Sequence, residues 1–335
     1  MALVATFLFI HTKQDYVIYG AITILSTSGS NLLNFYNLRR YISFRLCPVY
    51  NFKQHMRPIL IFFATTCAIV VYTQLNTVIL GLMKTNVDVG LYDSAMKIKN
   101  VLAGFVSALG AVLLPRTSYY IKQGMFNEFS GIIQKAIHFV CIVALPLISF
   151  FMLFATNGIH FLGGAHFDGA ILPMQIILPT LLFIGLTNII GIQILVPLGK
   201  EQEVFYSVVG GGIVDLIACI LLIPNFAVVG SAISNLLAEM MVFVIQFYYV
   251  GKYKGVVNIG VALHQVEYGK ICISVVIALS IIRRCRELML ADFYILLVSV
   301  SLFLILYGIC LFIFKESLFI KFLNVMKKKI EKNVG

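Results

Sequence analysis

The stretch Gly90-Leu91-Tyr92-Asp93-Ser94-Ala95-Met96-Lys97-Ile98-Lys99-Asn100 opens a long apolar run and carries three charged side chains into it. A charge at the centre of a membrane helix costs about 2.5–3.5 kcal/mol on insertion scales, so it usually faces a partner or a watery cavity. Asp93 and Lys97 are four residues apart and can pair on one helix face. Lys99 is rotated away from Lys97 by about 200°. The alternative is that both lysines extend their charges to the headgroup level.

The rest of the chain is equally apolar. Of its 335 residues, 60% are hydrophobic and 12% charged, and the mean hydropathy is +0.98. Apolar runs of about 20 residues, the length that crosses a bilayer, recur along it. We therefore predict an all-α, polytopic integral membrane protein with about nine transmembrane helices. The expected spans are 17–37, 57–82, 90–114, 132–155, 171–196, 203–223, 228–250, 268–285 and 290–314, with a tight turn at Pro224-Asn225-Phe226.

Basic residues predict the orientation. Most of the 25 lysines and arginines fall on one side when the loops between the expected spans are assigned alternately. By the positive-inside rule that side is cytoplasmic, and it includes the C-terminus. The basic tail with Lys327, Lys328 and Lys329 is expected to rest on anionic membrane lipids. The net charge of +11 is thus a topology signal, and no nucleic-acid partner is expected. The arginines at 283–286 break the rule, through snorkelling or a misassigned span.

Motifs for catalysis and for metal binding are missing from the sequence. There is no GxSxG, HExxH or P-loop lysine motif, and the seven cysteines show no metal-ligand spacing. We expect no enzyme activity, no catalytic residues, no cofactor and no metal. His160, His166 and Asp168 lie in the segment 156–169, for which a solvated loop is favoured over a metal site. The segment 115–131 mixes basic and aromatic residues, which is typical of a helix on the membrane surface.

Polar residues inside the expected spans form a second group of candidates. Tyr72 and Asn76 share one helix face, and Asp215 follows the triplet Gly210–Gly212. Asn and Gln in membrane helices most often make interhelical hydrogen bonds, whereas Asp215 and Glu239 are costlier to bury. We expect a cavity or a basic partner for the two acids. The glycines allow either close helix approach or a local break.

Several stretches, in their order and spacing over residues 57–250, together resemble the lipid-linked oligosaccharide flippases of polysaccharide biosynthesis. These proteins belong to the multidrug/oligosaccharidyl-lipid/polysaccharide exporter superfamily. The stretches are Tyr72–Gly81, Val89–Tyr92 with Lys97, Leu113–Arg116, Gly191–Lys200 and Gly230–Ser234.

The resemblance implies two six-helix lobes around a central cavity in the bacterial cytoplasmic (inner) membrane. Such a protein moves undecaprenyl-diphosphate-linked oligosaccharide repeat units outward by alternating access, with polysaccharide polymerase and assembly machinery as further partners. The chain resembles an N-terminally truncated member. Residues 1–56 would end the N-terminal lobe, 57–250 form the six-helix C-terminal lobe, 251–314 add two helices, and 315–335 form a basic cytoplasmic tail.

The resemblance also suggests roles for individual residues. Lys97 falls on a lysine of the family and is the first candidate for a diphosphate contact, because a cationic cavity suits a dianion. Lys99 is a weaker candidate, and Asn76 stands where the family often has an acid, which puts ion coupling there in doubt. The candidate cavity residues are Lys97, Lys99, Asp93, Asn76, Asp215 and Glu239.

Two alternatives to a flippase remain open at this stage. The first is a truncated remnant or subunit that does not transport by itself, in which Lys97, Asp215 and Glu239 would be exposed without partners. The second is a cation-coupled drug exporter of the same superfamily. The cationic Lys97 and Lys99 argue against this exporter because they would repel its substrates.

Overall fold

The computed structural model describes residues 5–6, 9–10, 16–38, 52–253, 255, 257–283, 292–321 and 323–324. It divides into two units, Met1–His55 and Met56–Gly335. In the first unit, helix α2 covers Tyr16–Leu38. The expectations for Lys327–Lys329, for Arg284 and Arg286, and for most of the loop at 38–57 concern residues outside the described ranges.

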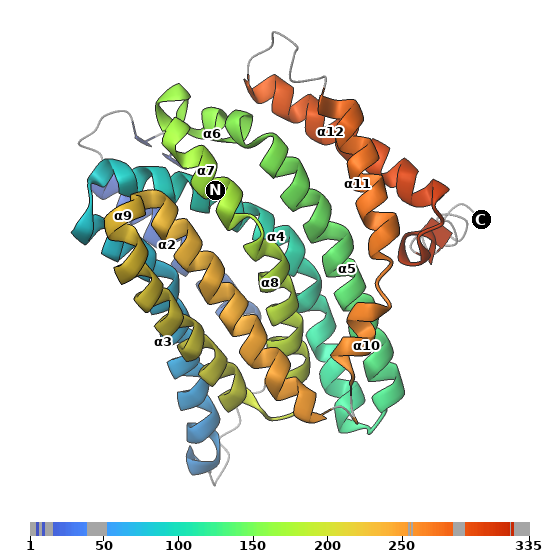
Figure 1. Ribbon diagram of the computed structural model, residues 1–335. Coiled ribbons are helices and arrows are strands. Elements are labelled where there is room, and N and C mark those ends of the chain that lie inside the picture. The colour runs from blue at the N-terminus through green and yellow to red at the C-terminus, as the bar shows by residue number, and fades with distance from the viewer. Residues whose placement is uncertain are drawn as a thin grey trace. The chain divides into compact units, whose positions relative to one another are not determined.

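The second unit is built from helices alone within the described residues (Figure 1). This confirms the predicted all-α membrane fold. In chain order, the elements are α3 (Phe52–Met83, which begins just before the unit boundary), α4 (Asn86–Lys122), α5 (Phe126–Leu153), α6 (Ala155–Gly163), η2 (Ala165–Ala170), α7 (Ile171–Ile177), α8 (Thr180–Thr187), η3 (Asn188–Leu195), α9 (Glu201–Val250), η4 (Gly251–Tyr253), α10 (Ile259–His264), α11 (Tyr268–Ile282) and α12 (Asp292–Ile313).

Five helices in the described part of the chain are long and apolar enough to cross a membrane, or six if a bent pair counts as one span. That pair, Ala165–Ile177 and Thr180–Leu195, bends by 45°. The break lies at Leu178-Pro179, where proline removes a helical hydrogen bond. The predicted number of nine spans is therefore not confirmed, although a helix occupies each expected span.

Helix α9 folds back on itself at the predicted Pro224–Phe226 turn. Ala227 has a φ of 45°, outside helical geometry, and the chain reverses there. The two arms then lie side by side (Figure 1), with Gln246 Nε2 donating to Ser207 Oγ at 3.0 Å. A Cβ on Gly211 would collide with Val242 of the other arm. Gly211 therefore serves close helix approach, and all three glycines of the triplet remain helical.

The prediction of a surface helix at 115–131 was wrong. The segment 115–131 is no separate surface helix, because α4 continues through Pro115 to Lys122 and α5 begins at Phe126. Gly124, with a φ of 70°, makes the turn between them. The segment 156–169, for which a solvated loop was favoured over a metal site, forms most of the short helices α6 and η2.

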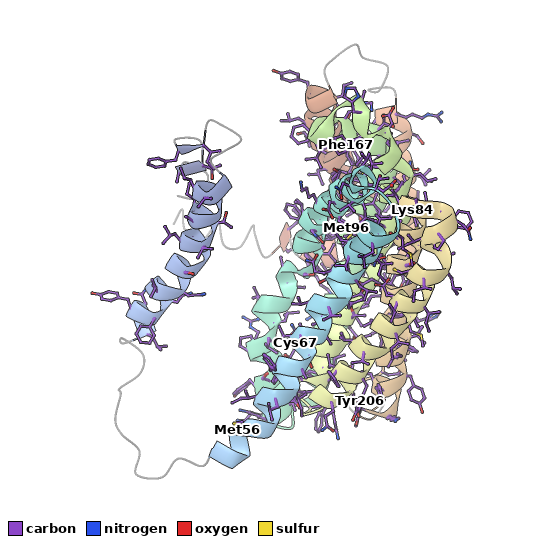
Figure 2. The ribbon with its side chains drawn as sticks, turned by 90° about the vertical axis from the view of Figure 1, so that its left-hand side faces the viewer. Met56, Cys67, Lys84, Met96, Phe167 and Tyr206 are labelled. Carbon is purple, nitrogen blue, oxygen red and sulfur yellow. The ribbon has the colours of Figure 1, made fainter. Side chains whose placement is uncertain are left out.

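Helix α4 is the central element of the second unit. It packs against α5, α7, α8, η3 and α9. Figure 2 shows Met56 and Tyr206 toward one end of this unit, and Lys84 and Phe167 toward the other. Helix α3 therefore runs from the Met56 end to the Lys84 end, and α4 starts back from there. This alternation agrees with the sides that the sequence assigned to these segments.

Candidate functional site

Helices α3 and α4 form a helical hairpin, which sets how far each candidate residue lies from the hairpin turn at Thr85. Thr85 caps α4: its side chain accepts from the Asp88 amide, and the Asp88 carboxylate accepts from the Thr85 amide. Thr77 and Asp93 lie equally far from Thr85 along their helices, about 12 Å at 1.5 Å per residue. The Thr77 hydroxyl accordingly donates to Asp93 Oδ1 at 3.4 Å.

A polar pocket of about 430 Å³ opens at this depth between the two helices. Among its lining residues are Asp93, Lys97 and Lys99 from the sequence-predicted set. Met96, labelled in Figure 2, marks its position on α4. The remaining lining residues are Thr73, Gln74, Thr77 and Asn100. A pocket this polar, part-way along membrane helices, provides hydrogen-bonding partners for a charged or hydroxyl-rich molecule.

The two lysines have different environments. Lys97 is exposed on the pocket side, whereas the Lys99 side chain is 5% exposed and points into the helix bundle. The pairing of Asp93 with Lys97, which their spacing allows, does not occur: among the described residues no ion pair within 4.0 Å involves either side chain. Lys97 thus presents an unneutralised ammonium to the pocket.

A second, fully buried polar group lies behind the pocket. Asn76 Nδ2 donates to both carboxylate oxygens of Asp215, at 3.0 and 2.9 Å, and the thiol of Cys219 donates to Asn76 Oδ1 at 3.0 Å. Asn76 and Asp215 are both 0% exposed. The group joins α3 to the first arm of α9. Asn76 therefore holds a carboxylate by hydrogen bonds.

Lys99 is a cation that interacts with this buried group. Its ammonium interacts electrostatically with the carboxylates of Glu239 and Asp215, which come from the two arms of α9. Glu239 is 8% exposed, so both acids are inside the helix bundle. The expected basic partner for the acids is therefore present. The idea that Asp215 and Glu239 would be exposed without partners was wrong.

Sequence reasoning missed Cys219 and Tyr92 as members of the buried group. Cys219 follows Asp215 by one helical turn, so that spacing was the available signal. The hydroxyls of Tyr72 and Tyr92 are buried. Both rings lie close enough to Asp215 and Glu239 to interact electrostatically with them. Aromatic residues in an apolar run gave no sign of this placement.

His160 and Asp168 also come together, as an ion pair between α6 and η2 when the imidazole is protonated. Within the described ranges, no group of three or more His, Cys, Asp or Glu side chains is arranged to hold a metal ion. This pair therefore offers two ligands, where a structural zinc site needs about four.

Fold and site together define a multi-pass helical membrane protein with a cationic pocket beside a buried charge cluster. Comparisons with known proteins agree. The family model described as "Polysaccharide biosynthesis protein" matches residues 1–121. A protein of Escherichia coli (strain K12) named for O-antigen transport is 25% identical over 71% of this chain and 57% of its own length. The flippase Agl15 of Haloferax volcanii, named for low-salt glycan biosynthesis, is 20% identical over 54% of this chain and 38% of its own.

The solved structure of a lipid II flippase MurJ, in an inward closed conformation, matches with a TM-score of 0.68 and 17% identity. The match covers 95% of this chain and 65% of that one. At this identity it shows the fold alone. The chain is thus similar to proteins named for O-antigen transport and for glycan flipping, the kind of protein that its motifs resemble. It spans 57% of the Escherichia coli relative and 65% of the solved structure.

Proposed function

We propose that this chain takes part in flipping a lipid-linked oligosaccharide, an undecaprenyl-diphosphate-linked repeat unit, across the bacterial cytoplasmic membrane. The observation that carries the proposal is the polar pocket at Lys97. This lysine lies about 17 Å along α4 from its start at Asn86, within one of the candidate membrane spans. An exposed ammonium at that depth is costly unless it faces water or an anion. A diphosphate is such an anion.

The residues divide into two roles under this proposal. Lys97, with Asp93 and Asn100, lines the pocket and contacts the diphosphate or the first sugars. Asn76, Asp215, Glu239 and the buried Lys99 balance charge inside the bundle and hold the helices on which the pocket is built. The diphosphate then passes along a cationic surface while the lipid tail stays in the bilayer.

The distribution of basic residues gives the orientation in the membrane. The end of the bundle marked by Met56 and Tyr206 faces the cytoplasm, by the excess of lysine and arginine in the loops assigned to it. The pocket then lies nearer the outer face, because α4 starts at the opposite end. An assembly enzyme or polymerase that accepts the flipped repeat unit is the partner that this placement suggests.

The test is complementation of a flippase-null strain with the full-length protein carrying Lys97→Ala, Lys97→Arg or Lys122→Ala. We expect Lys97→Ala to abolish surface polysaccharide and Lys97→Arg to retain part of it. Lys122→Ala is the matched control, because this exposed lysine ends α4 far from the pocket. Membrane insertion is checked by immunoblot of the membrane fraction. Normal polysaccharide with Lys97→Ala would refute the diphosphate contact, and efflux of organic cations would favour the drug exporter instead.

A further inference from the structure

A second and larger cavity lies at the other end of α4. Its volume is about 1200 Å³, and it lies between α4, α5, α10 and the segment that follows α12. Arg116 on its wall is about 28 Å along α4 from Lys97, at 1.5 Å per residue. The large cavity is therefore separate from the pocket proposed for the oligosaccharide.

The lining of this large cavity is cationic. Arg116 of α4, Lys135 of α5 and Lys321 of the terminal segment line it, against the single acid Glu128. All three basic side chains are exposed. In the part of the chain that the structure describes, none of them forms an ion pair. The lining thus carries a formal charge of about +2, which attracts an anion.

Apolar side chains continue the wall on both helices. Along α4, Leu109 and Leu113 precede Arg116 on one helix face, and along α5, Lys135 is followed by Phe139. The two helices run in opposite directions from the turn at Gly124. On each helix the cation therefore lies nearer the turn than these three apolar side chains. This order of charge and then hydrocarbon matches the headgroup and acyl chain of a lipid.

The wall formed by the terminal segment is fixed in place. Glu316 is 0% exposed, and its carboxylate accepts from the backbone amides of Leu318 at 3.1 Å and Phe319 at 2.6 Å. The same carboxylate contacts His138 Nε2 of α5 at 2.9 Å. Lys321 is thereby held over the cavity. The walls of the cavity therefore come from segments far apart in the sequence, with α4 and α5 on one side and the segment after α12 on the other.

We propose that the large cavity binds an anionic phospholipid of the cytoplasmic leaflet. The phosphate contacts Arg116, Lys135 and Lys321, and one acyl chain follows Leu109, Leu113 and Phe139. A free phosphate would use only the polar end of the cavity. The headgroup of a zwitterionic lipid would bring its own cation to a site that already has three. Such a lipid ties the terminal segment to α4 and α5 and is not the transported cargo.

The experiment measures lipid binding to the purified, delipidated full chain by native mass spectrometry. The probes are phosphatidylglycerol, phosphatidylcholine with the same acyl chains, and sn-glycerol 3-phosphate. We expect phosphatidylglycerol to bind about tenfold more tightly than phosphatidylcholine, and glycerol phosphate not to bind. Equal binding of the two lipids overturns the proposal. Saturable binding of glycerol phosphate at the same site shows a free-anion site and also overturns it.

The variants locate the binding. Arg116→Gln, Lys135→Gln and Lys321→Gln together are expected to remove the preference for phosphatidylglycerol. The control carries Lys122→Gln, Lys200→Gln and Lys252→Gln, which change the net charge equally at residues outside the cavity lining. An equal loss in the control shows non-specific attraction and refutes the site. Gel filtration and circular dichroism check folding, and Lys321→Gln alone replaces the triple variant if that variant misfolds.

Discussion

Asn76 on α3 and Asp215 on α9, 139 residues apart in the chain, form the central polar contact of the bundle. Both oxygens of the buried carboxylate accept from the same amide nitrogen, at 3.0 and 2.9 Å. Helix α3 has the lowest buried share of the five candidate spans, 11% of its most apolar window against 24–39% in the others. With so little packing, α3 is held beside α9 in part by this side-chain contact, together with the hydrogen bond from Lys84 Nζ to the Pro224 carbonyl oxygen at 2.8 Å.

Replacing Asn76 by Ala should therefore destabilise the protein. The change leaves a buried carboxylate without its two hydrogen bonds, and an unsatisfied buried charged group costs about 1–3 kcal/mol or more. Unfolding in mixed SDS–detergent micelles measures the loss. Gln74→Ala, two residues away and exposed, is the matched control and should change little. Equal stability of the two variants would show that the contact contributes nothing to holding α3.

Lys99 and Lys97 should respond differently to the same substitution. Lys99→Met removes the cation that faces two buried carboxylates, and losing one member of a buried charge group costs about 3–5 kcal/mol. Lys97→Met removes an exposed charge and should leave the unfolding free energy nearly unchanged.

The second change Glu239→Gln tests the cause of the Lys99 effect. It removes one of the two carboxylates that lack a cation in the Lys99→Met protein, so it should recover part of the lost stability. The double-mutant cycle is measured in the same micelle assay. Strictly additive effects would contradict the electrostatic interaction between Lys99 and Glu239.

The glycine triplet offers a test of helix contact. A Cβ at position 211 would collide with the side chain of Val242 and lie 3.1 Å from the Ala238 carbonyl oxygen. At position 212 the nearest atom would be the Tyr72 Cβ, at 3.7 Å, an ordinary contact. Gly211→Ala should therefore cost about 1–3 kcal/mol through overpacking. Gly212→Ala should be neutral or stabilising by up to about 1 kcal/mol, because Ala favours a helix. The reverse order would refute close packing of the α9 arms at Gly211.

The terminal segment should loosen at acidic pH. Burial opposes ionisation of the Glu316 carboxyl, but its contact with His138 and the amides of Phe319 and Leu318 outweighs burial and holds its pKa below the usual value. The stabilisation is therefore complete above the ordinary glutamate pKa and is lost as the pH falls through the lowered value. Hydrogen exchange of the Leu318 and Phe319 amides, corrected for intrinsic pH dependence, measures it. Glu316→Gln should weaken protection at neutral pH and remove the acid-dependent loss; an unchanged profile would contradict this.

The cavity candidates could be placed on helix faces from the sequence, but their surroundings could not. The spacing of Tyr72 and Asn76 predicted a shared face, and both are buried. The spacing of Asp93 and Lys97 permitted an ion pair, and Thr77 of another helix contacts Asp93 instead. Periodicity within one helix says nothing about the partner that a neighbouring helix supplies. For the same reason, the different exposure of Lys97 and Lys99 could not be read from either residue alone.

The sequence by itself determined that the chain is a helical membrane protein and which family it resembles. Long apolar runs can cross a bilayer only as helices or barrels. The motifs that carry the resemblance are short and local, so they can be recognised from the sequence alone. Only the tertiary structure decided that Asp215, Glu239 and Lys99 are buried together, while Lys97 lines a pocket. It also showed that Gly211 serves close packing and that Glu316 fixes the terminal segment. These features depend on contacts between residues far apart in the chain, which the helical period of each segment does not encode.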